Sequence, residues 1–317
     1  MKILVVGGAG YIGSRLVPSL LDHNYDVTVV DNLWFGNHLP KRAEVIKKDV
    51  FDLTENDIKG FDRVIFLAGI SNDPMAEYSP AQNFISNASG PAYLAYIAKK
   101  GGAKRFIYAD SCSVYGYAVN KFYDEKSPVT SSYPYGISKL QGEFGAMQLA
   151  DDNFSVICLR QGTVSGYSPR MRLDLIVNTM YKCAKVDKEI TVNNPSIWRP
   201  ILAISDAVKA YIRSIQASEE ISGVFNVASA NYTVGQVADI TWEYFHKILK
   251  QEVKLNIKNI QDFRNYKVTT KKAEEVLGID FKGSVESILN ELDKNCGDDF
   301  DYQKDNYYNI KVFKKLN

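Results

Sequence analysis

Histidine and cysteine are scarce in this chain, with three and four residues respectively among 317. The cysteines, Cys112, Cys158, Cys183 and Cys296, lie far apart, and no CxxC pair or histidine cluster accompanies them. Metal sites and disulfide frameworks depend on characteristic ligand spacings, so we expect neither. Unpaired thiols are typical of a reducing compartment, which predicts a cytoplasmic location.

The sequence also lacks a charge excess and any long apolar run. Lys plus Arg number 38 against 37 Asp plus Glu, a formal net charge of +1. The basic footprint of a nucleic-acid-binding protein is therefore missing. Glycines interrupt the first apolar run after residue 6, and no stretch approaches the roughly 20 apolar residues of a membrane-spanning helix. Because Met1-Lys2 leads directly into a strand-like run, we also expect no signal peptide.

What the sequence does contain is a regular alternation of strand-like and helical segments. Helix-period segments separate most of the short apolar runs, which are β-branched in character. This alternation predicts an α/β fold with a doubly wound parallel sheet, covered by helices on both faces. The runs are residues 2–6, 26–30, 62–67, 104–109 and 154–159.

The regularity loosens in the second half of the chain. We expect residues 1–165 to form the sheet domain and residues 166–317 to form a smaller α/β lobe that is interleaved with it. Within this lobe the patterns predict a short strand at 223–227 and helices near 173–184, 205–218 and 233–249. The tail from Gly297 is charged and aromatic, and the pattern leaves open whether it packs on the surface or frays.

Three glycines spaced three residues apart follow the first strand in the stretch "VVGGAGYIGS": Gly7, Gly10 and Gly13. In a strand-to-helix turn, Gly7 permits the tight turn, Gly10 lets a pyrophosphate approach the main chain, and Gly13 permits close helix packing. The amino end of the following helix then offers free N–H groups and a positive dipole end to phosphate. The loop therefore predicts a dinucleotide site.

Asp31 closes the second predicted strand, 18 residues after Gly13. A carboxylate there accepts hydrogen bonds from an adenosine ribose and repels a 2′-phosphate, which favours NAD over NADP. Arg15 and Arg42 are the nearby cations that would weaken this preference.

A tyrosine and a lysine lie four residues apart in "YPYGISKLQGEF", at the start of a predicted helix. At this spacing Tyr135 and Lys139 share one face of the helix. A phenol titrates near 10, so a phenolate base at neutral pH needs a neighbouring positive charge, which Lys139 supplies. Ser111 ends a buried strand at the edge where open α/β sheets bind ligands, and it donates to a substrate oxygen beside the phenol. Taken alone, this spacing is more typical of a solvated helix face, and it is the position beside Ser111 that favours catalysis.

In their order along the chain these motifs resemble the extended short-chain dehydrogenase/reductases. Together with "KKDVFD" around Asp49, "FLAG" at 66–69 and Asn87, they are similar to the NAD-dependent epimerase/dehydratase family, which acts on nucleotide sugars. The resemblance covers nearly the whole chain and implies a Rossmann domain with a catalytic triad of Ser111, Tyr135 and Lys139. The expected contacts with NAD are Gly7, Gly10, Tyr11, Ile12, Gly13, Asp31, Asn32, Asp49, Val50, Leu67, Ala68, Gly69, Asn87, Tyr135 and Lys139.

The same resemblance implies a nucleoside-diphosphate sugar, with GDP or UDP, as substrate. Guanidinium groups suit this task because their planar forks bind phosphate oxygens in pairs. For the arginines a surface salt bridge is the alternative, and for Ser71, Asn72 and Asp73 it is a helix-capping role. Arg170 shares the segment "SPRMRLDLIVN" with two of the candidates. The expected substrate contacts are Ser71, Asn72, Ser111, Arg172, Asn178, Arg199 and Arg264.

The residues after Ser111 bear on the type of reaction. In the dehydratases of this family, Asp and Glu follow the catalytic hydroxyl, whereas Cys112 and Ser113 stand here, so we do not expect dehydration. Thr163 and Pro200 depart from the ordinary UDP-galactose 4-epimerases. The stretch "TVSGYSPRMRLDLIVN" resembles bacterial surface-polysaccharide enzymes, including GDP-heptose 4-dehydrogenases.

We therefore predict hydride transfer at carbon 4 of a nucleotide sugar, either as net oxidoreduction or, as the alternative, as 4-epimerisation through a keto intermediate. A non-catalytic NAD sensor or scaffold is the competing class; it would be expected to have lost the Tyr/Lys pair or the serine. A small-molecule ketone reductase is disfavoured by the second lobe and its arginines. The family further implies a homodimer that forms through the helices near 80–100 and 135–150.

Overall fold

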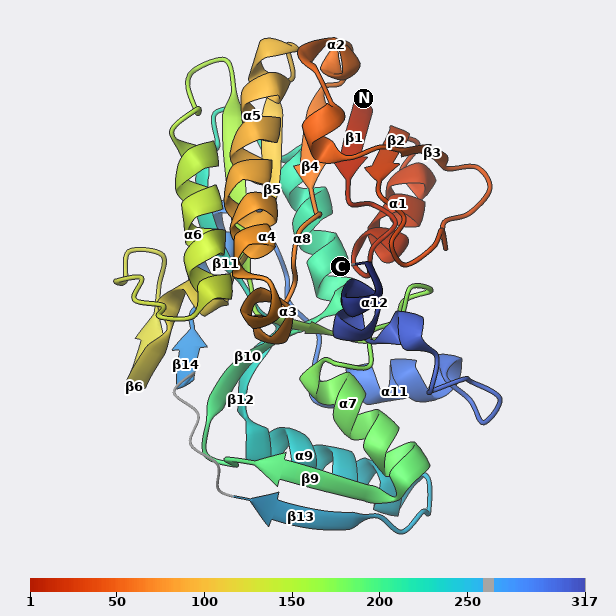
Figure 1. The fold of residues 1–317 in the computed structure, drawn as a ribbon. Helices are drawn as coiled ribbons and strands as arrows, with labels where there is room; N and C mark the ends of the chain where they lie inside the picture. The colour runs from red at the N-terminus through yellow and green to blue at the C-terminus, as the bar shows by residue number, and fades with distance from the viewer. Residues whose placement is uncertain (259–264, 317) are drawn as a thin grey trace.

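The larger lobe is built on a seven-stranded parallel sheet (Figure 1). The computed structural model describes residues 1–258 and 265–316, without the side chains of residues 117–120. The strand order is β11-β7-β5-β4-β1-β2-β3, so the winding reverses between β1 and β4, and ligands bind at the carboxyl ends of such a pair. The bounds are β1 Lys2–Val6, β2 Asp26–Asp31, β3 Glu44–Lys47, β4 Arg63–Phe66, β5 Arg105–Ser111, β7 Ser155–Gln161 and β11 Gly223–Val227.

The five apolar runs predicted as strands form β1, β2, β4, β5 and β7, which confirms the doubly wound fold class. All side chains of β4 and β7 are buried, as expected for strands that helices cover on both faces. The strand predicted at 223–227 is β11, and it pairs with β7 at the edge of this sheet. The sequence patterns missed β3, a four-residue edge strand whose side chains are mostly exposed.

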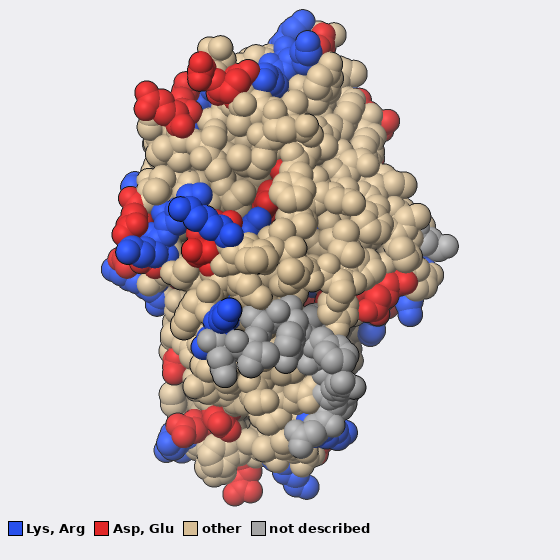
Figure 2. Space-filling model, turned by 90° about the vertical axis from the view of Figure 1, so that its left-hand side faces the viewer, with Lys and Arg blue, Asp and Glu red and all other residues tan. Residues whose placement is uncertain are grey.

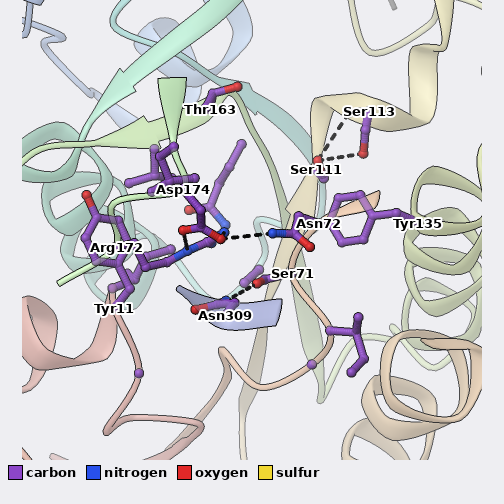
Figure 3. A pocket seen from close by; sticks show the side chains of 18 of the residues that line it. Tyr11, Ser71, Asn72, Ser111, Ser113, Tyr135, Thr163, Arg172, Asp174 and Asn309 are labelled. Atoms are coloured by element: carbon purple, nitrogen blue, oxygen red, sulfur yellow. Dashed lines mark hydrogen bonds and ion pairs between the residues drawn. The ribbon is translucent and has the colours of Figure 1, made fainter. Parts of the chain in front are cut away.

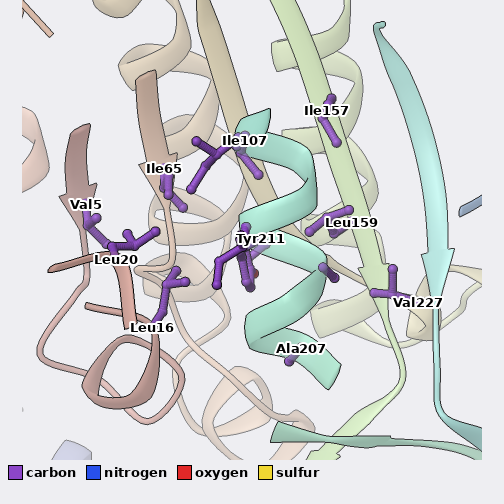
Figure 4. Close-up of a cluster of buried hydrophobic side chains, with 14 of the residues drawn as sticks. Val5, Leu16, Leu20, Ile65, Ile107, Ile157, Leu159, Ala207, Tyr211 and Val227 are labelled. Atoms are coloured by element: carbon purple, nitrogen blue, oxygen red, sulfur yellow. The ribbon is translucent and has the colours of Figure 1, made fainter. Parts of the chain in front are cut away.

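Helices cover both faces of the sheet and bury two apolar clusters. On one face, Leu16 and Leu20 of α1 and Tyr211 of α8 point toward the strands (Figure 4). On the other face, α5 and α6 bury a second cluster that includes Leu94 and Ala146. Because α8 follows strands of the second lobe, the chain leaves this sheet and later returns to it. The bounds are α1 Gly13–Asp22, α5 Gly90–Lys100, α6 Pro134–Met147 and α8 Ile204–Gln216.

The smaller lobe has an apolar core of its own, which includes Tyr181, Phe245 and Leu289. A three-stranded sheet, β12-β10-β8, joins it to the larger lobe, and β9 pairs with β13 at its far end (Figure 1). The helices predicted in this half correspond to α7, α8 and α9. The bounds are β8 Thr163–Ser165, β9 Glu189–Asn193, β10 Trp198–Ala203, β12 Ala230–Thr233, β13 Lys254–Lys258, α7 Ile176–Lys182, α9 Val234–Glu243 and α11 Val285–Asn295.

The end of the chain packs as a helix, α12, at the junction of the two lobes (Figure 1). Phe313 of this helix is fully buried with Ile70 and Met75 of the larger lobe. The open question about the tail is thus answered in favour of packing. None of the described helices is long and apolar enough to cross a membrane. The remaining strands and α-helices are β6 Tyr117–Tyr123, β14 Asn265–Val268, α2 Glu55–Ile58, α3 Asp73–Tyr78, α4 Pro80–Phe84, α10 Lys271–Leu277 and α12 Asn309–Leu316, and a π-helical turn, Ile85–Ser89, connects α4 with α5.

Candidate active site

Two adjoining cavities open at the carboxyl ends of β1 and β4. The larger cavity has a volume of about 520 Å³ and lies between the lobes, and the smaller has about 240 Å³ and lies beside β2. Both cavities are lined by Gly7 and Gly10 of the glycine loop, by Phe35 and by residues 67–69. A single elongated ligand can therefore occupy both cavities along this shared wall.

The three loop glycines are needed for different reasons. Gly7 has a positive φ of +82°, and a Cβ there would lie 2.3 Å from the Ala68 nitrogen. A Cβ on Gly13 would lie 2.2 Å from the Gly8 carbonyl oxygen, so the fold itself requires both glycines. A Cβ on Gly10 would meet only the Gly7 oxygen, at 3.2 Å. The bare main chain at Gly10 instead borders the cavities at the start of α1, which fits a bound pyrophosphate.

The smaller cavity contains the residues predicted for the adenosine end. Asp31 accepts hydrogen bonds from the Ala9 nitrogen at 3.0 Å and the Leu33 nitrogen at 2.7 Å, which fix its carboxylate at the end of β2. Burial raises the pKa of Asp31 above its usual value. Asn32 donates to Asp49 at 2.9 Å and so ties the β2 end to the opposite wall, which Val50 continues. These residues fit a ribose and an adenine.

The two arginines that would weaken a preference for NAD are bound elsewhere. Arg15 donates to Glu291 at 2.7 Å and to the Tyr167 carbonyl at 2.8 Å, which links α1 to the second lobe. Arg42 forms an ion pair with Asp22 on the surface. Neither lines the cavities.

Ser111 and Tyr135 line the larger cavity (Figure 3). Lys139 lines it as well. Ser111 ends β5, and its hydroxyl oxygen accepts a hydrogen bond from the Ser113 hydroxyl at 2.8 Å. Tyr135 lies in the first turn of α6, and Lys139 follows one turn later. The Lys139 Nζ lies 5.9 Å from the centroid of the Tyr135 ring and donates to the Ala109 carbonyl at 2.8 Å. The fold thus brings the three predicted residues together.

Tyr135 is buried among charged side chains. Burial raises the pKa of Tyr135, while a hydrogen bond with Ser111 and the positive charge of Arg172 act in the opposite direction. Burial also lowers the pKa of Lys139, to about 8. Arg172 is therefore a second cation near the phenol, beside the predicted Lys139, whose effect on the tyrosine pKa stays a prediction.

Arg172 belongs to a network that the sequence patterns did not reveal. Its guanidinium binds both carboxylate oxygens of Asp174, at 2.9 and 3.0 Å. Although burial raises the pKa of Asp174, the attraction of Arg172 outweighs it, and the net shift is downward. Asn72 donates to Asp174 at 3.0 Å across the cavity and also accepts from the Met75 nitrogen at 3.1 Å (Figure 3). Asn72 therefore caps α3 and also lines the cavity, while its contact with a sugar stays a prediction.

Two predicted contacts are displaced from the cavities. Asn178 is fully buried and binds the carbonyls of Gly166 and Arg172 and the Tyr11 hydroxyl, so it braces the second lobe and is not available to a substrate. Asn87, in the π-helical turn, binds both main-chain groups of Ile70 at 3.0 and 2.8 Å. It positions the loop after β4 and does not line either cavity, so its contact with the cofactor stays a prediction.

Two further predicted residues line the larger cavity. Arg199 enters the larger cavity from β10, and Ser71 enters it from the loop after β4. Arg264 lies outside the described residues. The sequence patterns missed Asn309, which lines the larger cavity from α12 and donates to the Ser71 hydroxyl at 2.6 Å. Its position at the far end of the chain gave no signal, whereas Asp174 could have been found by its place two residues after Arg172.

Comparison with known proteins identifies the family to which the chain belongs. Residues 3–228 match the profile of the NAD dependent epimerase/dehydratase family. The UDP-glucose 4-epimerase of Corynebacterium glutamicum is 27% identical over 263 residues, 77% of this chain and 80% of that protein. UDP-glucuronic acid decarboxylase 3 of Arabidopsis thaliana is 27% identical over 308 residues, 88% of this chain and 84% of that protein.

Among solved structures, the UDP-glucose 4-epimerase of Thermotoga maritima, solved with UDP-glucose, superimposes with a TM-score of 0.82 at 25% identity. The match covers 94% of this chain and 100% of that chain. The architecture, the two cavities and the residues that line them agree with the sequence match, which spans most of the chain. The chain therefore belongs to the NAD dependent epimerase/dehydratase family, whose members are enzymes of the extended short-chain dehydrogenase/reductase type.

Proposed function

We propose that the protein is a 4-epimerase of a UDP-sugar. One observation carries the proposal: the serine, tyrosine and lysine of the predicted triad line the same cavity as the glycine loop. A dinucleotide whose adenosine lies in the smaller cavity would extend along the shared wall toward Tyr135. The relatives named above include UDP-glucose 4-epimerases, which favours epimerisation over the net oxidoreduction that the sequence alone suggested.

The side chains supply the proton transfer. Tyr135 takes the proton of the sugar's 4-hydroxyl, and Ser111 orients that hydroxyl by hydrogen bonding. A bound NAD, held by the glycine loop and Asp31, would supply the hydride acceptor and donor for carbon 4, and its oxidised form would add positive charge beside the phenol. Since burial raises the pKa of Tyr135, ionisation of the phenol depends on the hydrogen bond from Ser111 and on the charge of Arg172.

Loss of water is disfavoured by the residues after Ser111. Cys112 is fully buried, and its thiol donates to the Arg160 carbonyl at 3.0 Å. The Ser113 hydroxyl is engaged with Ser111 itself. Neither residue offers the carboxylic acid that elimination of a hydroxyl group needs, so the chemistry stays at one carbinol carbon.

The nucleotide end of the sugar substrate would lie against the second lobe. Arg199 lines the larger cavity opposite the glycine loop, and its planar guanidinium is suited to a pyrophosphate. We assign UDP because the relatives named above act on UDP-sugars. GDP-sugars are the alternative substrates to be tested beside them.

We also propose that the protein is a homodimer, formed through the helical face of α5 and α6. Three large apolar side chains on this face are about half exposed: Ile85 at 51%, Tyr96 at 50% and Phe144 at 56%. Figure 2 shows this side of the molecule, where a broad area carries few charged side chains. A second copy would bury these side chains.

The test is incubation of the purified protein with UDP- and GDP-linked hexoses, with and without a 2-keto acid as electron acceptor. Epimerisation predicts a new 4-epimer, detected by NMR, with no net change in NADH absorbance and no need for the acceptor. A 4-keto or reduced product that forms only with an acceptor or donor would identify net oxidoreduction instead. Absence of any conversion would contradict both and favour a non-catalytic NAD sensor.

A further inference from the structure

Arg170 is a buried cation that the proposed reaction does not use. It lies in the loop between β8 and α7, is 2% exposed, and borders the larger cavity. Its guanidinium carbon lies 3.7 Å from the centroid of the Phe35 ring. It donates to the Asn309 side-chain carbonyl and, at 3.5 Å, to the Met171 carbonyl. Its buried Nε has no hydrogen-bond partner among the described residues.

No carboxylate forms an ion pair with Arg170 within the described part of the chain. The nearest acidic side chain of the segment, Asp174, is bound at both oxygens by Arg172. Burial lowers the pKa of Arg170 to about 9, and the charge of Arg172 adds to this effect. A buried guanidinium without a counter-ion is costly, so the site is built to receive an anion.

The position of Arg170 indicates which anion. Phe35, on which it stacks, follows β2 and lines both cavities, as do Gly7 and Gly10. A dinucleotide with its adenosine at Asp31 and its nicotinamide toward Tyr135 has its pyrophosphate at this junction. We propose that Arg170, held in place by Asn309 of the C-terminal helix, is the cation that binds the pyrophosphate of NAD. The inference rests on the use of NAD in the proposed function.

Asn309 is suited to holding this cation without neutralising it. It is 4% exposed; its carbonyl accepts from Arg170, and its amide donates to Ser71 at 2.6 Å. It thus connects the loop after β4 with the loop after β8. Helix α12 is anchored by Phe313, whose ring lies 5.9 Å from that of Trp34. A carboxylate at the same position would pair with the guanidinium and compete with a phosphate, whereas a neutral amide leaves the charge available.

The experiment compares two ligands that differ only in phosphate, adenosine and ADP, with UDP, which carries the same diphosphate on another base. The full chain is freed of bound nucleotide with charcoal, and adenosine, ADP and UDP are titrated by calorimetry. Arg170→Met should weaken ADP binding about 10- to 100-fold while changing adenosine and UDP binding less than about 2-fold. Arg199→Met is the matched control, since this arginine of the same cavity should weaken UDP and leave ADP unchanged.

Asn309→Asp separates positioning from a merely structural role. The substitution keeps the shape of the side chain and strengthens its bond to Arg170, so the melting temperature of the nucleotide-free protein should stay the same or rise. ADP binding should nevertheless weaken at least about 5-fold, because the new carboxylate neutralises the cation. Unchanged ADP affinity in this variant would show that Asn309 only braces the helix.

The remaining outcomes of these titrations also test the proposal. Equal ADP affinity in Arg170→Met and the unmodified protein would overturn the proposal, and loss of UDP rather than ADP binding would assign Arg170 to the sugar nucleotide. If Arg170→Met fails to fold, Arg170→Lys takes its place: it keeps the charge without the planar fork and should bind ADP with intermediate affinity. An unmodified protein that binds neither adenosine nor ADP would sink the proposed function itself.

Discussion

The two walls of the larger cavity are built to hold ligands by different physical means. The wall of the first lobe offers main chain: Gly10 and the amino end of α1 present N–H groups, with no side chain between them and the cavity. The wall of the second lobe offers side chains, the guanidinium groups of Arg170, Arg172 and Arg199. A wall of bare main chain needs glycines at a fixed spacing, and that spacing can be recognised in a sequence. Side chains reach a ligand only after distant segments have packed, so their roles depend on the fold.

The largest expected effect tests whether chemistry and cofactor binding are separate in this arrangement. Tyr135→Phe removes the group that exchanges the proton and leaves the glycine loop intact. Turnover should fall by at least about 1,000-fold, within the range for loss of a general acid–base group, while NAD affinity stays within about 2-fold. Steady-state rates and a fluorescence titration of NAD measure the two. Undiminished turnover would remove Tyr135 from the mechanism.

The next test applies one substitution to two glycines of the same loop. Gly10→Ala places a methyl group in the cavity and should weaken NAD binding about 10- to 100-fold, with little change in the melting temperature. Gly13→Ala forces a Cβ to within 2.2 Å of the Gly8 carbonyl and should lower the free energy of unfolding by about 1–3 kcal/mol. Calorimetry and thermal melting distinguish the two. Equal destabilisation by both would mean that Gly10 serves packing and not the ligand.

The smallest expected effect concerns Lys139 and pH. Burial lowers the pKa of Lys139 to about 8, below the value of about 10.4 for an unperturbed lysine. Between these values the unfolded chain binds the proton and the folded protein does not, so this group makes stability rise with pH. From pH 8 to 9.5, the unfolding free energy of the cofactor-free protein, relative to Lys139→Met, should rise by up to about 2 kcal/mol. Denaturant titrations at both pH values measure it, and parallel pH profiles would contradict the burial effect.

Sequence reasoning reached much of this structure because its strongest signals are local. Five strands of the sheet, the glycine loop and Asp31 follow from spacing within a strand–helix unit, whereas the triad was predicted from the order of motifs that resembles a known family. The sequence did not reveal the partners of the buried amides: Asn178 and Asn87 bind main-chain and side-chain groups that only tertiary packing brings near. Asn309 was missed for the same reason, since the loop that it contacts lies 238 residues away in the sequence.

The return of the chain to its first sheet has a consequence for how such enzymes change specificity. β11 and α8 belong to the larger lobe, although they follow strands of the smaller one. A fragment ending at residue 165 would lack an edge strand and a covering helix, and would expose the apolar face of β7. Exchange of residues 166–317 with a relative would therefore also replace this edge strand and this covering helix, so a hybrid that keeps the larger lobe intact needs crossovers on either side of residues 204–227.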